Sequence, residues 1–255
     1  MDSTRKPFQG VANIVRFNWP FYVLASLAVI NLLIAGSLYH GRFAAYLTIA
    51  AWLISLPVFI SLLVSLYVYD LAGLYTLKWL DDAALHTPKN IVNISAGFDE
   101  TSALLQQKYG STTLTALDFY DAVKHTEPSI KRARRAYPSY PGTQVISTTR
   151  IPFADATTDA AFLLFAAHEI RNGAERIGFF KELERTLAPG GKIIVAEHLR
   201  DVSNFLAYNI GFLHFLPRAA WLKTFEQSGL YIEAEKHHTP FVTVFILRKN
   251  DGAAP

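Results

Sequence analysis

Two histidines follow apolar runs of the chain and are the side chains best suited to move a proton. His168 closes the run at 159–167, and His198 follows the run at 192–197. Histidine changes its charge near neutral pH, so each imidazole is a candidate general base or a group that orients a reacting atom. Tyr208 lies in the apolar stretch that follows and is a third candidate. The alternatives are structural: a helix start, a solvated loop or ordinary packing.

These candidates depend on the elements expected after residue 70, where short apolar runs alternate with amphipathic stretches. We expect strands at 90–95, 113–118, 144–147, 159–167, 192–197, 230–237 and 241–248. Helices are expected at 100–109, 127–136, 169–187, 201–215 and 219–228. Glu169 is expected to cap the first turn of its helix, where an acid is favoured. The alternation predicts an α/β fold with a doubly wound, mostly parallel seven-stranded sheet.

Two long uncharged segments precede this domain. No Asp, Glu, Lys or Arg occurs between Arg16 and Arg42, or between Arg42 and Asp70. Each segment exceeds the roughly 20 residues that cross a bilayer as a helix. We therefore expect a two-helix transmembrane hairpin at 20–70. The alternative is a helical hairpin buried in a soluble protein.

The hairpin divides the chain into four parts: an N-terminal cytosolic tail at 1–19, the hairpin, a catalytic domain at 71–249 and a disordered tail at 250–255. The tail before the hairpin carries three Lys or Arg residues, whereas the turn carries only Arg42. The positive-inside rule then places the catalytic domain in the cytosol.

Composition excludes several classes of protein. The chain has no cysteine, so disulfide frameworks and cysteine nucleophiles are excluded. Its net charge of +3 is too small to indicate a nucleic-acid partner. No metal site is expected, and the oligomeric state is left open.

Four segments resemble the motifs of class I S-adenosylmethionine-dependent methyltransferases, over about residues 88–249. NISAGFD at 93–99 stands where that family has its glycine-rich turn after the first strand, and Asp118 ends the second strand. IPF at 151–153 is similar to the family's Leu-Pro-Phe segment, and LAPGGK at 187–192 to its Pro-Gly-Gly turn. The Rossmann-like methyltransferase sheet is the fold that this resemblance implies.

The resemblance also implies S-adenosyl-L-methionine as cofactor and assigns residues to it. Asp118 would accept hydrogen bonds from the ribose hydroxyls, and Phe119 or Tyr120 would pack on the adenine ring. The adenine amino group would lie near Ser147 or Thr148. The turn that approaches the methionine part contributes small or acidic side chains: Ser95, Ala96, Gly97 and Asp99.

The turn departs from the family pattern at several positions. It keeps one glycine of three, Asn93 replaces the usual acid, and Asp99 stands where the last glycine would be. An acid at that place is able to meet the amino group of the cofactor. The alternative is a plain strand-to-helix turn that Asp99 caps.

Together these features predict a membrane-anchored methyltransferase that acts on a lipophilic small molecule or a lipid. An apolar stretch around Tyr208 is expected to cover the acceptor site. One alternative is a repurposed or non-catalytic domain of the same fold that binds the cofactor or a partner at the membrane. A nicotinamide-dependent reductase is a weaker alternative, because the chain has no Gly-x-Gly-x-x-Gly turn.

Overall fold

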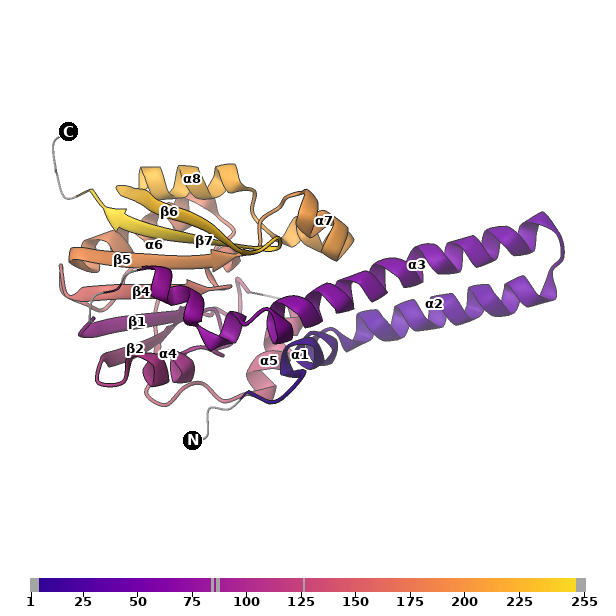
Figure 1. Ribbon diagram of the computed structural model, residues 1–255, viewed down its shortest axis with the longest axis horizontal. Helices are drawn as coiled ribbons and strands as arrows, with labels where there is room; N and C mark the ends of the chain where they lie inside the picture. Colours follow the sequence, from indigo (N-terminus) through magenta and orange to yellow (C-terminus); the bar gives the residue numbers. More distant parts are fainter. Residues whose placement is uncertain (1–4, 84, 86–87, 126, 251–255) are drawn as a thin grey trace.

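The computed structural model describes residues 5–83, 85, 88–125 and 127–250. Except for residue 250, the tail expected at 250–255 lies outside the described residues. Figure 1 shows two parts, a layered α/β body and a pair of long helices that project from it.

The body is built on one seven-stranded sheet with the order β3-β2-β1-β4-β5-β7-β6. Its strands are β1 (Asn90–Ser95), β2 (Thr113–Asp118), β3 (Gln144–Val145), β4 (Thr158–Leu164), β5 (Leu187–Glu197), β6 (Leu230–Thr239) and β7 (Val242–Lys249). Neighbours from β3 to β5 are parallel, whereas β7 is antiparallel to β5 and β6. The fold class predicted from the alternation of runs is therefore confirmed.

Helices cover both faces of the sheet. The α-helices are α1 (Gln9–Phe17), α2 (Trp19–Leu38), α3 (Arg42–Leu66), α4 (Ser102–Tyr109), α5 (Pro128–Ala136), α6 (Gly173–Thr186), α7 (Val202–Tyr208) and α8 (Arg218–Gln227). Shorter helical segments are η1 (Tyr67–Leu71), η2 (Leu74–Thr76), η3 (Lys78–Ala83), η4 (Ala167–Glu169) and η5 (Asn209–His214). One face buries Phe180 of α6 and Trp221 of α8. The other face buries Leu105 of α4 and Leu77 of the η1–η3 segment.

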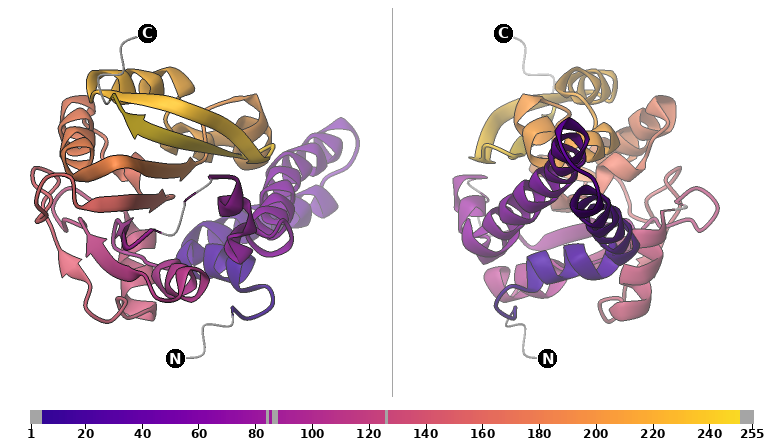
Figure 2. Two further views of the ribbon diagram at one scale, coloured as in Figure 1. Left: turned by 60° about the vertical axis from the view of Figure 1, so that its left-hand side comes forward. Right: turned by 90° about the vertical axis from the view of Figure 1, so that its right-hand side faces the viewer.

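Helices α2 and α3 form an antiparallel hairpin that projects to one side of the body (Figure 2). They are long and apolar enough to cross a membrane, with mean hydropathies of 2.1 and 2.4 over the best windows. None of the first window and 6% of the second is buried. Large side chains such as Leu24, Trp52 and Leu53 are exposed. The hairpin therefore is not a core element of the body.

Helix α1 lies at the base of the hairpin, against α5 (Figure 1). The Asp70 carboxylate accepts hydrogen bonds from the backbone N–H groups of Gly10 and Val11, both at 2.8 Å. An acid at this end of a helix satisfies free N–H groups and complements the helix dipole. A Cβ at Gly10 would lie 2.4 Å from Cβ of Tyr69, so only glycine permits this approach. Part of the range expected as a tail is thus a helix that is bonded to the end of the hairpin.

Candidate active site

The turn after β1 brings Ser95 beside Asp118, because these residues are register partners at the ends of two parallel strands. Gly97 has φ +97°, a conformation that side chains with a Cβ rarely adopt. A Cβ built there would lie only 2.9 Å from Cδ2 of Tyr120. The single glycine retained in this turn is therefore required by its backbone and by its neighbour.

Both carboxylate oxygens of Asp118 have partners. Oδ1 accepts a hydrogen bond from the backbone N–H of Tyr120 at 2.9 Å, and Oδ2 lies 2.6 Å from Nη1 of Arg134. The Arg134 guanidinium also lies 4.3 Å from the centre of the Tyr120 ring. Helix α5 thus places the Arg134 guanidinium on the carboxylate that the family resemblance assigns to the ribose hydroxyls.

Asp99 and Asn93 form the rest of the turn. Oδ1 of Asp99 accepts hydrogen bonds from the backbone N–H groups of Thr101 and Ser102, both at 2.9 Å, and from Nδ2 of Asn93 at 3.1 Å. Asp99 thereby orders the start of α4, as the structural alternative proposed. Oδ1 of Asn93 is buried and has no hydrogen-bond partner among the described residues. An unpartnered buried acceptor at this turn fits a ligand with N–H groups.

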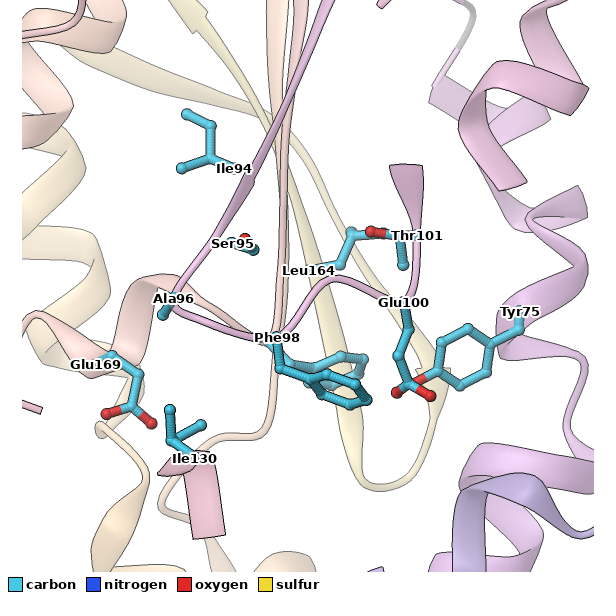
Figure 3. Close-up of a pocket in the computed structure, with 11 residues that line it drawn as sticks. Tyr75, Ile94, Ser95, Ala96, Phe98, Glu100, Thr101, Ile130, Leu164 and Glu169 are labelled. Atoms are coloured by element: carbon cyan, nitrogen blue, oxygen red, sulfur yellow. The ribbon is translucent and has the colours of Figure 1, made fainter. Parts of the chain in front are cut away.

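A hollow of about 90 Å³ lies at this turn, and Figure 3 shows Ala96, Phe98, Glu100 and Tyr75 around it. Pockets for small molecules are usually roughly 300–1,000 Å³ in volume. A nucleoside therefore needs more room here, and we expect α5, which carries Arg134, to shift when a ligand enters.

The remaining residues that the sequence assigned to the cofactor have other contacts. Phe119 is buried in the core, where its ring centre lies 5.5 Å from that of Phe179. Ser147 pairs with the hydroxyl of Thr149 at 2.9 Å. Thr148 is buried and donates a hydrogen bond to Glu175. The roles assigned to these three residues stay predictions.

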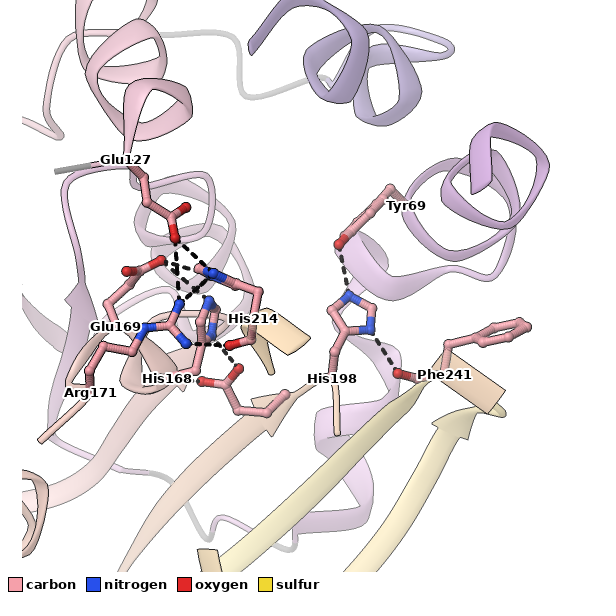
Figure 4. A network of polar contacts seen from close by, with 9 residues as sticks. Tyr69, Glu127, His168, Glu169, Arg171, His198, His214 and Phe241 are labelled. Atoms are coloured by element: carbon pink, nitrogen blue, oxygen red, sulfur yellow. Dashed lines mark hydrogen bonds and ion pairs between the residues drawn. The ribbon is translucent and has the colours of Figure 1, made fainter. Parts of the chain in front are cut away.

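A second group of side chains lies at the ends of β4 and β5 (Figure 4). His168 lies in η4, and its Nδ1 is 2.7 Å from Oε2 of Glu197, the fully buried last residue of β5. His214 of η5 stands against it, with ring centres 4.9 Å apart. Nδ1 of His214 is 2.8 Å from Oε1 of Glu127. Residues far apart in the chain thus form one polar cluster, which also includes Glu169 and Arg171.

Carboxylates determine the charge of these two imidazoles. Burial disfavours the protonated form of His168, but Glu197 and Glu169 outweigh burial and raise its pKa to about 10. The pKa of His214 is raised in the same way, by Glu127 and Glu169 against burial. Burial acts to raise the pKa of Glu169, but hydrogen bonds to both imidazoles lower it well below its usual range. The carboxylates therefore favour the protonated form of both imidazoles, and most strongly that of His168.

His198 has the opposite surroundings. Burial lowers its pKa to about 4, so this imidazole is neutral. Its Nδ1 lies 2.7 Å from the carbonyl oxygen of Phe241, which requires a proton on Nδ1. Nε2 then accepts a hydrogen bond from the Tyr69 hydroxyl at 2.8 Å. His198 thus connects the end of β5 to η1, the segment that follows the hairpin.

A cavity of about 640 Å³ extends from the base of the hairpin to both histidine sites. The hairpin contributes walls from both of its helices: Phe21, Tyr22, Pro57, Val58, Ser61 and Ser65. The other end is lined by the candidate acid–base side chains: His168, Glu169, His198, Tyr208 and His214. The buried hydroxyls of Tyr208 and Ser65 lie against each other in this wall. The lining is therefore mostly apolar, with polar side chains at the histidine end and at Arg5, Asn13 and Glu100 near α1.

Sequence reasoning placed His168, His198 and Tyr208 in this region but made one error beside them. Helix α6 begins at Gly173, and the side chain of Asn172 caps it by accepting a hydrogen bond from Glu175 N–H. The expectation that Glu169 caps this helix is wrong, because β4 ends early and Glu169 turns towards the histidines. Glu127 was missed altogether, since its sequence neighbourhood carries no sign of a site.

Residues 92–195 match the protein family described as methyltransferase domain. No curated protein matches the chain. Among solved structures, an S-adenosylmethionine-dependent methyltransferase from Aquifex aeolicus is similar, with 16% identity, a TM-score of 0.52 and coverage of 75% of this chain and 97% of that one. A methyltransferase from Methanosarcina mazei has 16% identity, a TM-score of 0.51 and coverage of 68% and 97%.

Human N-acetylserotonin methyltransferase in complex with S-adenosylmethionine has 12% identity, a TM-score of 0.54 and coverage of 93% of this chain and 70% of its own. These structures share the fold, and the family match supplies the activity. Residues 92–195 thus form an S-adenosylmethionine-dependent methyltransferase domain, with S-adenosylmethionine as its cofactor. The predicted enzyme class and cofactor are confirmed.

Proposed function

We propose that this S-adenosylmethionine-dependent methyltransferase takes a lipophilic acceptor from a bilayer that its α2–α3 hairpin crosses. The observation that carries the proposal is the cavity of about 640 Å³, whose walls belong to the hairpin at one end and to the histidine sites at the other. A long apolar molecule with one polar end fits such a shape. The substrate is therefore a lipid or a lipophilic small molecule whose head reaches β4 and β5.

The exposure of the hairpin supports its place in a membrane. A core helix of a soluble protein is mostly buried, whereas α2 has no buried residue. Leaving so many large apolar side chains in water is unfavourable, at roughly 25 cal/mol for each Å². Since the hairpin crosses twice, α1 and the catalytic domain lie on the same side. The Lys and Arg bias makes that side the cytosol.

The residues at the turn fit the cofactor. Asp118 would bind the ribose once Arg134 moves away, and Gly97 lets the backbone approach the methionine part. Oδ1 of Asn93 offers an unpartnered acceptor to the amino group. When bound, the cofactor supplies an electrophilic methyl group on a sulfonium.

The protein's own side chains position the acceptor. Glu197 holds Nδ1 of His168, which leaves Nε2 on the cavity side. The Tyr208 hydroxyl provides a second polar contact inside the cavity wall. Orientation of the acceptor and exclusion of water are the main contributions that such a transfer needs. His168 acts here as an orienting group, because its pairing with Glu197 fixes the position of its ring.

The proposal is tested with full-length protein in lipid nanodiscs, by following transfer of a labelled methyl group into a lipid extract. Calorimetry with S-adenosylmethionine gives a separate reading, and Asp118→Ala should weaken that binding strongly. Val58→Trp, which fills the cavity beside the hairpin, should abolish transfer to lipophilic acceptors and leave cofactor binding unchanged. Leu53→Trp is the matched control, because Leu53 is 71% exposed on the same helix.

A normal rate of transfer in Val58→Trp would contradict entry of the acceptor from the hairpin. Methylation of only water-soluble acceptors by the wild type would contradict the lipophilic substrate.

A further inference from the structure

Three side chains of the histidine cluster have the spacing of metal ligands. Oε1 of Glu169 lies 3.4 Å from Nε2 of His168 and 3.4 Å from Nε2 of His214. All three potential ligand atoms lie within 4.8 Å of one another. Charge-assisted hydrogen bonds are shorter, at about 2.7–2.9 Å. Ligand atoms placed about 2.05 Å from one tetrahedral Zn²⁺ ion are instead about 3.3 Å apart.

The outer nitrogen of each imidazole lies beside a carboxylate. Nδ1 of His168 is 2.7 Å from Glu197, and Nδ1 of His214 is 2.8 Å from Glu127. Metal-binding histidines usually donate their second N–H to a carboxylate in this manner, which fixes the ring and makes the free nitrogen a better ligand. Both Nε2 atoms then lie 3.4 Å from the same oxygen of Glu169.

The charge balance of the cluster also favours a bound cation. The cluster contains three carboxylates, those of Glu127, Glu169 and Glu197, and one guanidinium, that of Arg171, which pairs with Glu127. With neutral imidazoles this cluster carries two negative charges, so either two protons or one divalent ion can balance it. The cavity borders all three ligand residues, and a metal ion there would keep a position open to the acceptor.

Arg171 is the group that opposes a metal ion. Its guanidinium lies against both ring nitrogens of His214, and it cannot become a ligand because it has no free acceptor. Its side chain is 42% exposed, so it is able to withdraw towards solvent while keeping Glu127 within reach. Arg171 therefore competes with a metal ion for His214, but it is able to move aside when the ion binds.

We propose that His168, Glu169 and His214 bind a divalent transition-metal ion of the Zn²⁺ type, whose open position takes the oxygen of the methyl acceptor. The identity of that acceptor rests on the proposed function, whereas the metal site does not. As a Lewis acid the ion lowers the pKa of the acceptor hydroxyl. Its O–H bond breaks and the proton passes to solvent. The O–CH₃ bond forms as the S–CH₃ bond of the cofactor breaks, and S-adenosylhomocysteine leaves.

The test uses the full-length protein in nanodiscs, stripped of metal with a chelator and titrated with Zn²⁺ against a competing chelating dye. We expect one ion per chain. Co²⁺ in place of Zn²⁺ should give the visible absorption of a four- or five-coordinate site. No stoichiometric binding, or only a six-coordinate Co²⁺ spectrum, would overturn the proposal.

Four variants sharpen the test. Glu169→Gln and His214→Gln should weaken Zn²⁺ binding more than about 100-fold, and Glu197→Gln about 10–100-fold. Arg171→Gln should tighten it, because a competing cation is removed. His237→Gln is the control, since His237 is an exposed histidine of β6 outside the cluster. Unchanged Zn²⁺ affinity in both Glu169→Gln and His214→Gln would overturn the assignment.

Binding of S-adenosylmethionine is measured on each variant as a check that the domain is folded. Zn²⁺ bound at this site without any methyl transfer would contradict the proposed function and leave the metal site standing. Transfer that is unaffected by complete removal of metal would contradict the role of the ion in the reaction.

Discussion

His168 and His198 follow the ends of neighbouring parallel strands, and both are buried, yet their surroundings move their pKa values in opposite directions. His168 lies between the carboxylates of Glu197 and Glu169, which raise its pKa to about 10. His198 lies among the rings of Phe165, Tyr208 and Phe215, and burial lowers its pKa to about 4. Position on the sheet brings a histidine to the site, but its neighbours decide whether it carries charge there.

The largest contrast is expected in the rate of methyl transfer. His168→Gln should lower kcat by about 100-fold or more, the range seen when a group at the reacting atoms is lost. His198→Gln should lower it by less than about tenfold. Turnover is measured with saturating S-adenosylmethionine, and calorimetry checks that both variants bind the cofactor. Equal losses in the two variants would remove the distinction between an acceptor site and a structural histidine.

Acidification tests the neutral histidine. Above pH 6.5 the His198 imidazole is neutral in the folded and the unfolded chain. Between about pH 4 and 6.5 only the unfolded chain binds the proton, so folding stability is lost as pH falls through this window. The loss amounts to about 3 kcal/mol by pH 4. Thermal unfolding in detergent should show a shallower pH dependence in His198→Gln, and an unchanged slope would contradict a depressed pKa.

Removal of the Tyr69 hydroxyl is expected to have a smaller effect on stability, and it acts through the same histidine. Tyr69→Phe leaves Nε2 of His198 without its donor, which should lower the free energy of unfolding by about 1–3 kcal/mol. Tyr67→Phe is the control, because Tyr67 is 44% exposed in the same segment. Urea titrations in detergent compare the two variants. If both lose the same amount, the Tyr69–His198 bond contributes nothing to the connection between hairpin and sheet.

The smallest effect is expected at Asp118, whose carboxylate is paired with the guanidinium of Arg134. Arg134→Gln removes the cation that covers the carboxylate and should tighten binding of S-adenosylmethionine several-fold. Arg135→Gln, at an exposed position of the same helix, should leave the affinity unchanged. Calorimetry measures the affinity of both variants for S-adenosylmethionine. Weaker binding in Arg134→Gln would show that this side chain binds the cofactor and does not compete with it.

Local patterns predicted most of the sheet and the ends at which the candidate residues lie. The apolar runs predicted β1 and β2 to the residue, and the histidines were recognised because each follows such a run. The error at Glu169 has a physical cause: β4 leaves the sheet after Leu164, and Phe165 adopts φ 55°, which no local pattern indicates. The chain therefore turns Glu169 inwards before α6 begins.

Short-range periodicity and spacing were enough to predict the two long apolar segments, the α/β order, the methyltransferase motifs and Asp118 at the end of β2. The tertiary structure brings together the side chains of the histidine cluster. Glu127, His168 and His214 come from three separate segments, and their charges depend on distances of a few ångströms across the fold. It also placed Arg134 on Asp118 and α1 on Asp70, contacts between residues that no local pattern links.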